Sequence, residues 1–270
     1  MPASCNTDIF ADALGKHSRF RKAYILLTRS LLLKNNIIRK EIMLCGRRKS
    51  KVQHVLYAGF GMGQLLGLFA RQKSKFNVLA IDKNSRMVAQ SSNYYKDEGV
   101  KNIYCRTGDI LSFHQPKTFD LCMAINLLNY IEDDRLALKN MYECLKKPGM
   151  LLVFNSSNYA DERDNKLTTN VYKDKRYRNG YSLIELKAKL REAGFSKMKA
   201  RYVYGTPGVL SWKLTTGWPS YMVKTSRLFF LILPFYTVIC IPFVILFNFL
   251  DVTLRHKKGK CIVVKAFKQS

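Results

Sequence analysis

Acidic side chains are scarce in this chain. Against 46 Lys and Arg there are 19 Asp and Glu, so the formal net charge is +27 over 270 residues. A charge of this size favours an anionic partner: nucleic acid, an anionic membrane surface or an acidic substrate. It carries no information about the fold.

Several other signals are missing. The seven cysteines are scattered without a C-x-x-C pair, which indicates reduced, mostly buried thiols in a reducing compartment. The N-terminal residues MPASCNTDIF lack a basic segment followed by an apolar one, so we do not expect a secretory signal. Internal repeats and low-complexity linkers are absent from the sequence. Hydrophobic residues make up 47% of the chain, enough for one large α/β domain or two small ones.

From residue 52 onward, short apolar runs alternate with amphipathic segments. We expect strands over Val52–Ala58, Phe76–Asp82, Asn102–Arg106, Phe119–Ile125, Met150–Asn155, Phe195–Gly205 and Lys260–Phe267. We expect helices over Gln64–Gln72, Ser85–Glu98, Asp133–Lys146 and Ser182–Ala193, the last with a capping box at its start. This alternation predicts parallel βαβ units with helices on both faces, and a ligand outside the carboxyl ends of the strands.

The stretch VLYAGFGMG is the candidate ligand-binding turn between the first expected strand and the helix after it. Its apolar run ends in Gly59, Gly61 and Gly63, and an amphipathic segment follows. Glycines at such a turn permit positive φ and let a ligand approach the backbone, while the next helix offers free N–H groups. An ordinary strand-to-helix turn has the same local pattern, so the motif alone leaves both interpretations open.

Taken in order, the motifs resemble a class I S-adenosylmethionine-dependent methyltransferase over most of the chain, from about residue 52 to 267. The resemblance is carried by the G-x-G-x-G turn, an acidic residue ending the second strand, Gly-Asp after the third, the Lys-Pro-Gly turn at 147–149 and the Glu-Ala-Gly-Phe run at 192–195. It implies a Rossmann-like three-layer α/β sandwich, with a mostly parallel seven-stranded sheet whose last strand is antiparallel. N-terminal helices and an apolar helical insert would be added to it.

The resemblance also implies the cofactor, S-adenosyl-L-methionine, and the residues that hold it. The implied cofactor-binding residues are Tyr57, Gly59, Gly61, Gly63, Asp82, Lys83, Asp109, Ile110 and Asn126. Asp82 would accept hydrogen bonds from the ribose hydroxyls, and Asp109 one from the adenine amino group. The family usually has an acidic residue where this chain has Tyr57, which leaves a catalytically degenerate domain as an alternative. No metal is implied, and we assign no general base.

Leu228–Leu250 is a 23-residue run without charge, long enough to span a bilayer. Pro234 and Pro242 interrupt it, and basic residues flank it. In this family the last two strands form an antiparallel hairpin, so both ends of the insert must lie on one side. We therefore expect a re-entrant or in-plane membrane element broken near the prolines, a single span being less favoured. A hydrophobic subdomain that covers the site or forms a dimer interface is the alternative.

These expectations give an N-terminal helical cap over residues 1–50, with a helical pattern over Arg19–Cys45, and a cofactor-binding domain over 51–205. The apolar insert covers 206–259 and the final strand 260–270. The function predicted is methylation of a lipophilic small molecule (a lipid, quinone, isoprenoid or polyketide-like compound) on the cytoplasmic side of a membrane. An RNA or protein methyltransferase using the basic surface, and a non-catalytic interaction module, are the alternatives.

Overall fold

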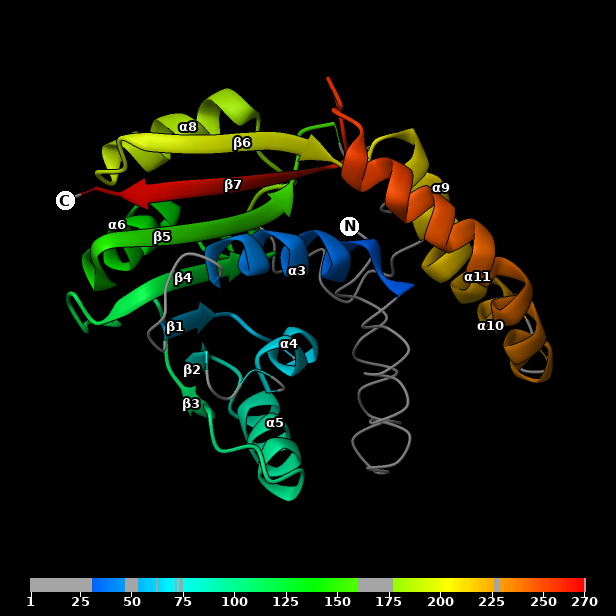
Figure 1. Cartoon of the computed structure of the whole chain (residues 1–270), viewed down its shortest axis with the longest axis horizontal. Helices are drawn as coiled ribbons and strands as arrows, with labels where there is room; N and C mark the ends of the chain where they lie inside the picture. Colours follow the sequence, from blue (N-terminus) through cyan, green and yellow to red (C-terminus); the bar gives the residue numbers. More distant parts are fainter. Residues whose placement is uncertain are drawn as a thin grey trace.

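The computed structural model describes residues 31–46, 53–61, 63–70, 72, 75–159, 177–225 and 229–269. Its centre is one seven-stranded sheet with strand order β3-β2-β1-β4-β5-β7-β6 (Figure 1). The strands are β1 Gln53–Ala58, β2 Phe76–Asp82, β3 Ile103–Thr107, β4 Phe119–Ile125, β5 Leu145–Ser156, β6 Lys197–Val203 and β7 Cys261–Lys268. Strands β1 to β5 are parallel, and β7 runs antiparallel to both of its neighbours. The predicted sheet is confirmed.

Three of the helices that flank the sheet begin at side chains that cap them. Asn84 accepts hydrogen bonds from the backbone of Arg86 and Met87 at the start of α5 Ser85–Asp97. Asp133 does the same for α6 Asp134–Cys144, and Ser182 for α8 Leu183–Glu192. These caps satisfy N–H groups that the helix itself leaves free. The predicted helix Gln64–Gln72 is shorter than expected: a 3₁₀ turn, η1 Gln64–Leu66, leads into the single turn α4 Gly67–Ala70.

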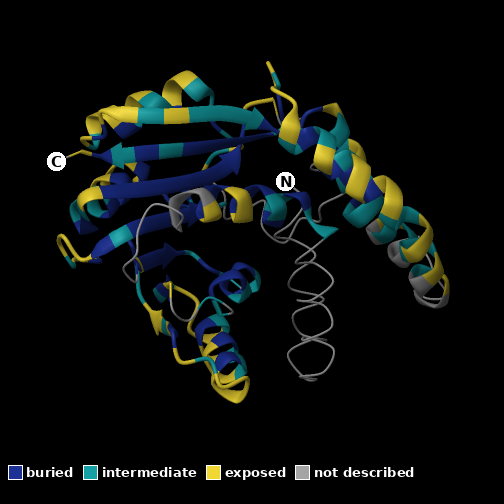
Figure 2. Ribbon diagram, viewed as in Figure 1, coloured by how far each residue is buried: buried dark blue, intermediate teal, exposed yellow. Residues whose placement is uncertain are grey.

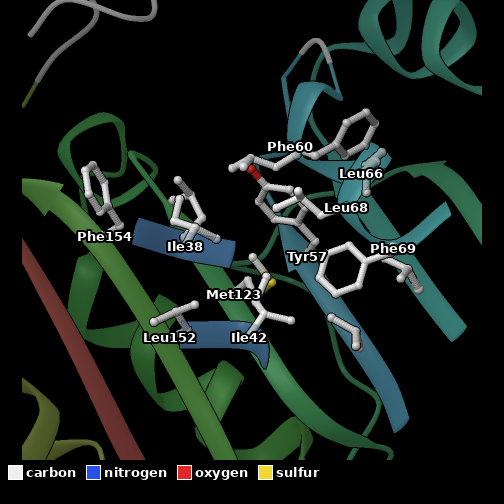
Figure 3. Packing of buried hydrophobic residues seen from close by; sticks show 14 of the residues in the cluster. Ile38, Ile42, Tyr57, Phe60, Leu66, Leu68, Phe69, Met123, Leu152 and Phe154 are labelled. Carbon is white, nitrogen blue, oxygen red and sulfur yellow. The ribbon is translucent and has the colours of Figure 1, made fainter. Parts of the chain in front are cut away.

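Successive residues of each central strand point to opposite faces of the sheet, so the core has two halves. Val55 and Tyr57 of β1 pack with α3, α4 and α5, whereas Leu56 and Ala58 pack with α6 and α8. Helix α3 Leu33–Gly46 lies across the first face, where Ile38 meets β5 near Phe154 (Figure 3). The earlier part of the helix expected over Arg19–Cys45 lies outside the described residues.

The segment between β6 and β7 forms a helical hairpin that extends away from the sheet (Figure 1). Its outgoing arm consists of α9 Thr206–Trp212, the π-helical turn η4 Lys213–Gly217 and α10 Trp218–Thr225. Its returning arm is α11 Phe229–Thr253. The expected break at the prolines is wrong, because α11 runs continuously through Pro234 and Pro242. A proline removes one backbone hydrogen bond, and a helix packed along a neighbour can continue through that loss.

Candidate functional site

The glycine turn lies at the carboxyl end of β1, between β2 and β4, where the strand order reverses. Gly59, Gly61 and Gly63 have φ values of 67°, 56° and 71°, a region that other residues rarely adopt. A Cβ on Gly59 would lie 2.5 Å from Leu127 Cδ1, so this glycine is needed for packing. A Cβ on Gly61 would meet nothing within 4 Å. The turn therefore presents open backbone at Gly61, as close approach by a ligand requires.

Asp82, the last residue of β2, holds the glycine turn in place. Its Oδ2 accepts a hydrogen bond from Gly61 N at 2.8 Å, and its Oδ1 accepts one from Asn84 N at 2.9 Å. An ionised carboxylate has room for about four hydrogen bonds. Asp82 thus fixes the turn and keeps the capacity to accept donors such as ribose hydroxyls.

Asp109, after β3, lies beside the same edge. Its Oδ2 is 2.9 Å from the ammonium group of Lys83, and its Oδ1 accepts a hydrogen bond from Leu111 N at 3.0 Å. Gly108 N donates to Asp82 O at 3.0 Å, which ties the ends of β2 and β3 together. The adjacent Ile110 is buried. The structure therefore brings the predicted residues of the second and third strands to one place.

Asn126 follows β4 and has a positive φ of 57°. Its backbone N donates to Phe154 O at 2.7 Å, so the backbone is fixed in this conformation. Its side-chain Oδ1 is buried and has no hydrogen-bond partner among the described residues. An unsatisfied buried acceptor costs about 1–3 kcal/mol. A bound ligand carrying an N–H or O–H group would remove this cost, so the site fits a polar cofactor here.

Tyr57 is buried in the core below the turn, near Phe60 and Leu68 (Figure 3). Burial, and then the nearby charge of Asp82, raise the pKa of its phenol well above its ordinary value. The side chain is therefore neutral at physiological pH. It fills the position where an acidic residue was expected, but it cannot supply that residue's negative charge to a cationic ligand.

A chain of buried amides at the ends of β4 and β5 was not singled out from the sequence. Asn155 Nδ2 donates to Asn129 Oδ1 at 2.7 Å, and Asn129 Nδ2 donates to Ser156 Oγ at 3.0 Å. All three residues are buried. The available signal was the abrupt change from the apolar run MLLVF to N-S-S at the end of β5. These hydrogen bonds between Asn155, Asn129 and Ser156 fix η2 Leu128–Tyr130 against the ends of β4 and β5, beside Asn126.

A buried ionic network lies next to these amides. The Asp134 carboxylate accepts hydrogen bonds from Tyr181 Oη at 2.6 Å, from Lys189 Nζ at 2.8 Å and from the guanidinium of Arg178. Burial raises the pKa of Asp134, but the hydrogen bonds from Lys189 and Tyr181 and the nearby positive charges outweigh it, so the net pKa is lowered. Tyr181 is wholly buried in this network.

Metal chemistry finds no support in the part of the chain that the structure describes. No group of three or more His, Cys, Asp or Glu side chains is placed to hold an ion there. The cysteines that the structure describes (Cys105, Cys122, Cys144, Cys240 and Cys261) are free thiols. Cys5 lies outside the described residues.

Comparison with known proteins agrees with this geometry. Residues 55–149 match the sequence profile of a methyltransferase domain. Carboxy-S-adenosyl-L-methionine synthase of Nautilia profundicola is 23% identical over 170 residues, which cover 62% of this chain and 71% of that protein.

Solved structures share the fold. A phosphoethanolamine N-methyltransferase of Haemonchus contortus, in complex with phosphomonomethylethanolamine and S-adenosylhomocysteine, superposes with a TM-score of 0.61 at 15% identity over 86% of this chain. The chain spans only about half of that protein, 52% of its length. A methyltransferase of Thermotoga maritima gives a TM-score of 0.56 at 15% identity and covers 95% of this chain and 98% of its own.

Proposed function

We propose that this chain, which carries an S-adenosylmethionine-dependent methyltransferase domain of the class I fold, methylates a lipophilic small molecule at a membrane surface. The observation that carries the proposal is the position of α11. This apolar helix, whose single charged residue is Asp251 near its end, returns to the sheet at the start of β7. Because β7 pairs along β5, the helix is rooted at the same edge as Asn126 and the glycine turn (Figure 1).

The cofactor would be held by residues already in place. Gly61 exposes backbone, Asp82 keeps free lone pairs for ribose hydroxyls, and Asp109 lies where an adenine amino group can donate to it. Asn126 Oδ1 can accept a hydrogen bond from the cofactor. S-adenosylmethionine itself supplies an activated methyl group on a sulfonium. The protein's contribution is to hold donor and acceptor in line and to exclude water.

The acceptor side is built from the ends of β4 and β5 and from the root of the hairpin. Phe154 and Tyr204 lie edge to face there, with ring centroids 6.3 Å apart. Tyr204 is half-buried, and burial of its phenol raises its pKa well above the ordinary value, so it is a neutral aromatic wall. Apolar walls beside an apolar helix favour an acceptor that partitions into lipid. We assign no general base.

The net charge of +27 would also suit an RNA or protein acceptor. That alternative explains the charge but gives no reason for a long apolar helix whose side chains are exposed to solvent. A non-catalytic module is favoured only by Tyr57, which lacks the usual negative charge. Cofactor binding and product analysis separate these alternatives.

The first test is calorimetric titration with S-adenosylmethionine. Asp82→Ala should weaken binding at least tenfold, because it removes the group that holds Gly61 and can accept from the ribose. Asp120→Ala is the matched control: Asp120 also accepts a backbone hydrogen bond, from His54 N at 2.9 Å, but at the opposite end of the sheet. Its affinity should stay near that of the unmodified protein. No binding by the unmodified protein would overturn the enzymatic proposal.

The second test identifies the acceptor class. Cells with and without the gene are fed methionine carrying a labelled methyl group, and lipid extract, RNA and protein are separated. We expect gene-dependent label in the lipid extract. Gene-dependent label confined to RNA or protein would overturn the lipophilic acceptor while leaving methyl transfer intact.

A further inference from the structure

One face of α11 is apolar and open to solvent over the described side chains from Ile232 to Phe249; Figure 2 shows exposed residues along this part of the helix. This outward face consists of Ile232, Phe235, Val238, Ile239, Phe243, Ile245, Leu246 and Phe249, each at least half exposed. Of the apolar window Phe235–Thr253, only 17% is buried inside the protein. Soluble proteins rarely leave so long an apolar surface uncovered.

The opposite face of α11 is fixed to the outgoing arm by polar contacts. Ser211 Oγ donates to Asn248 Oδ1 at 2.6 Å, and Tyr236 Oη donates to Leu214 O at 3.0 Å. At the root, Asp251 accepts a hydrogen bond from Gly205 N at 2.8 Å. The two arms therefore move together as one body.

The exposed charged side chains at the root of the hairpin are all positive. Arg255, Lys257 and Lys258 follow α11 directly and are exposed. In the sequence, Asp251 is the only acidic residue after Glu192, and it is fully buried and hydrogen-bonded. We call these three exposed cations the basic collar. It would attract anionic lipid headgroups.

We propose that the hairpin lies in the plane of an anionic phospholipid bilayer, with the outward face of α11 among the acyl chains and the basic collar among the headgroups. The proposal rests on the membrane location in the proposed function and adds the docking surface, its orientation and its lipid preference. An interfacial helix of this kind combines an apolar face with basic residues at headgroup level.

The arms of the hairpin argue against end-on insertion. At 1.5 Å per residue the 25 residues of α11 would reach about 37 Å, enough to cross a core of about 30 Å. Its packed partner must then cross as well, yet α11 is the one helix in the described part of the chain that is long and apolar enough. The outgoing arm carries Lys213 and Lys224, and Arg227 lies between the arms in the sequence. Placing a charged side chain at the bilayer centre is energetically costly.

Two observations favour lipid over a second copy of the chain as the occupant. A net charge of +27 makes two copies repel each other, whereas it attracts an anionic surface. Trp218 and Tyr221 on α10 are also exposed, and such aromatic residues prefer the boundary between headgroups and acyl chains.

The first experiment is flotation of the full chain with phosphatidylcholine vesicles, with and without phosphatidylserine, in the absence of cofactor and acceptor. The variant Phe235→Ser/Phe249→Ser should lose binding to both kinds of vesicle. Its control, Ile184→Ser, removes an exposed apolar side chain from α8, away from the hairpin, and should bind normally.

A charge-reversed collar, Arg255→Glu/Lys257→Glu/Lys258→Glu, should bind phosphatidylserine vesicles at least tenfold more weakly. The control Lys96→Glu/Lys101→Glu/Lys139→Glu makes the same charge change at exposed positions outside the hairpin. It should stay within about twofold of the unmodified protein. Equal losses in both variants would show attraction by net charge alone and would overturn the collar.

The second experiment measures depth. The chain has two tryptophans, so Trp212→Phe leaves Trp218 as the sole reporter. Lipids brominated near the headgroup should quench its fluorescence more than lipids brominated near the chain ends. Stronger quenching from the chain ends would show end-on insertion and overturn the in-plane orientation. A dimer in light scattering that dissociates in Phe235→Ser/Phe249→Ser, without vesicle binding, would assign the outward face to a second copy.

These outcomes are distinct from failure of the proposed function. A chain that binds vesicles but transfers no methyl group would overturn the enzymatic role alone. A chain that methylates a lipophilic acceptor without binding vesicles would overturn the docking surface and the membrane location, and would leave methyl transfer intact.

Discussion

Gly61 of the glycine turn can be compared with Gly99, a glycine of similar backbone conformation elsewhere in the chain. Gly61 and Gly99 both have positive φ, 56° and 64°, and a Cβ on either would meet nothing within 4 Å. Gly99 lies after α5, away from the cofactor-binding residues. Alanine at either position therefore imposes a similar backbone strain, about 1–2 kcal/mol.

We expect Gly61→Ala and Gly99→Ala to lower the melting temperature by similar amounts. Only Gly61→Ala should weaken S-adenosylmethionine binding, by at least tenfold, because its methyl group occupies the space left for the ligand. Thermal melts and calorimetry measure the two effects. Equal affinities in the two variants would contradict a ligand position against Gly61.

The sequence predicts residues whose role depends on local spacing. The glycines, Asp82 and Asp109 follow strands at positions that chain order alone defines. The partners of Asp134 could not be predicted in this way, because Arg178 and Lys189 are 44 and 55 residues further along the chain. The orphaned Oδ1 of Asn126 depends on how side chains pack and is equally invisible in the sequence.

At the level of elements, the Asp134 network joins α6 to α8. Replacing Asp134 by Asn leaves two half-buried cations, Arg178 and Lys189, without their buried anion, which should lower the free energy of unfolding by about 3 kcal/mol at pH 7. Asp97→Asn on the surface of α5 is the control and should change it by less than about 0.5 kcal/mol. Chemical denaturation measures both.

The pH dependence of the same variant follows from the lowered pKa of Asp134. A depressed carboxyl pKa stabilises the fold above the unfolded value, near 3.9, and this contribution is lost as the pH falls through the folded value. The stability difference between the unmodified protein and Asp134→Asn should therefore be constant from pH 7 to about pH 5 and shrink below pH 4. A constant difference down to pH 2 would contradict the ionic role.

The helices and strands whose apolar residues recur at regular spacing were predicted well. The apolar segment between the last two strands was predicted only in part. Its place between the last two strands is confirmed, because family topology fixes both of its ends. Its continuity was missed, because proline interrupts a helix in isolation but not necessarily one packed along a partner. The contacts of Tyr236 and Asn248 with the outgoing arm appear only in three dimensions.

For the whole molecule, the net charge of +27 predicts that thermal stability depends on the salt concentration. Like charges repel in the compact state, and salt shortens the range of this repulsion to about 10 Å at 0.1 M. The melting temperature should therefore rise by a few degrees between low and moderate NaCl. The variant Lys96→Gln/Lys101→Gln/Lys139→Gln should show a smaller rise. A melting temperature that falls with added salt would contradict net repulsion.

The chain leaves the sheet and returns to it at one point. Val203, the last residue of β6, pairs with Cys261, the first of β7, and Lys260 N donates to Tyr204 O at 3.0 Å. The residues between them add only an isolated bridge, from His256 to Tyr202 of β6, and leave the pairing of β6 with β7 intact. The hairpin is therefore an insertion: a tight turn from Val203 to Cys261 would close the sheet without it. The same insertion in a methyltransferase of this topology would place such a hairpin beside a different active site.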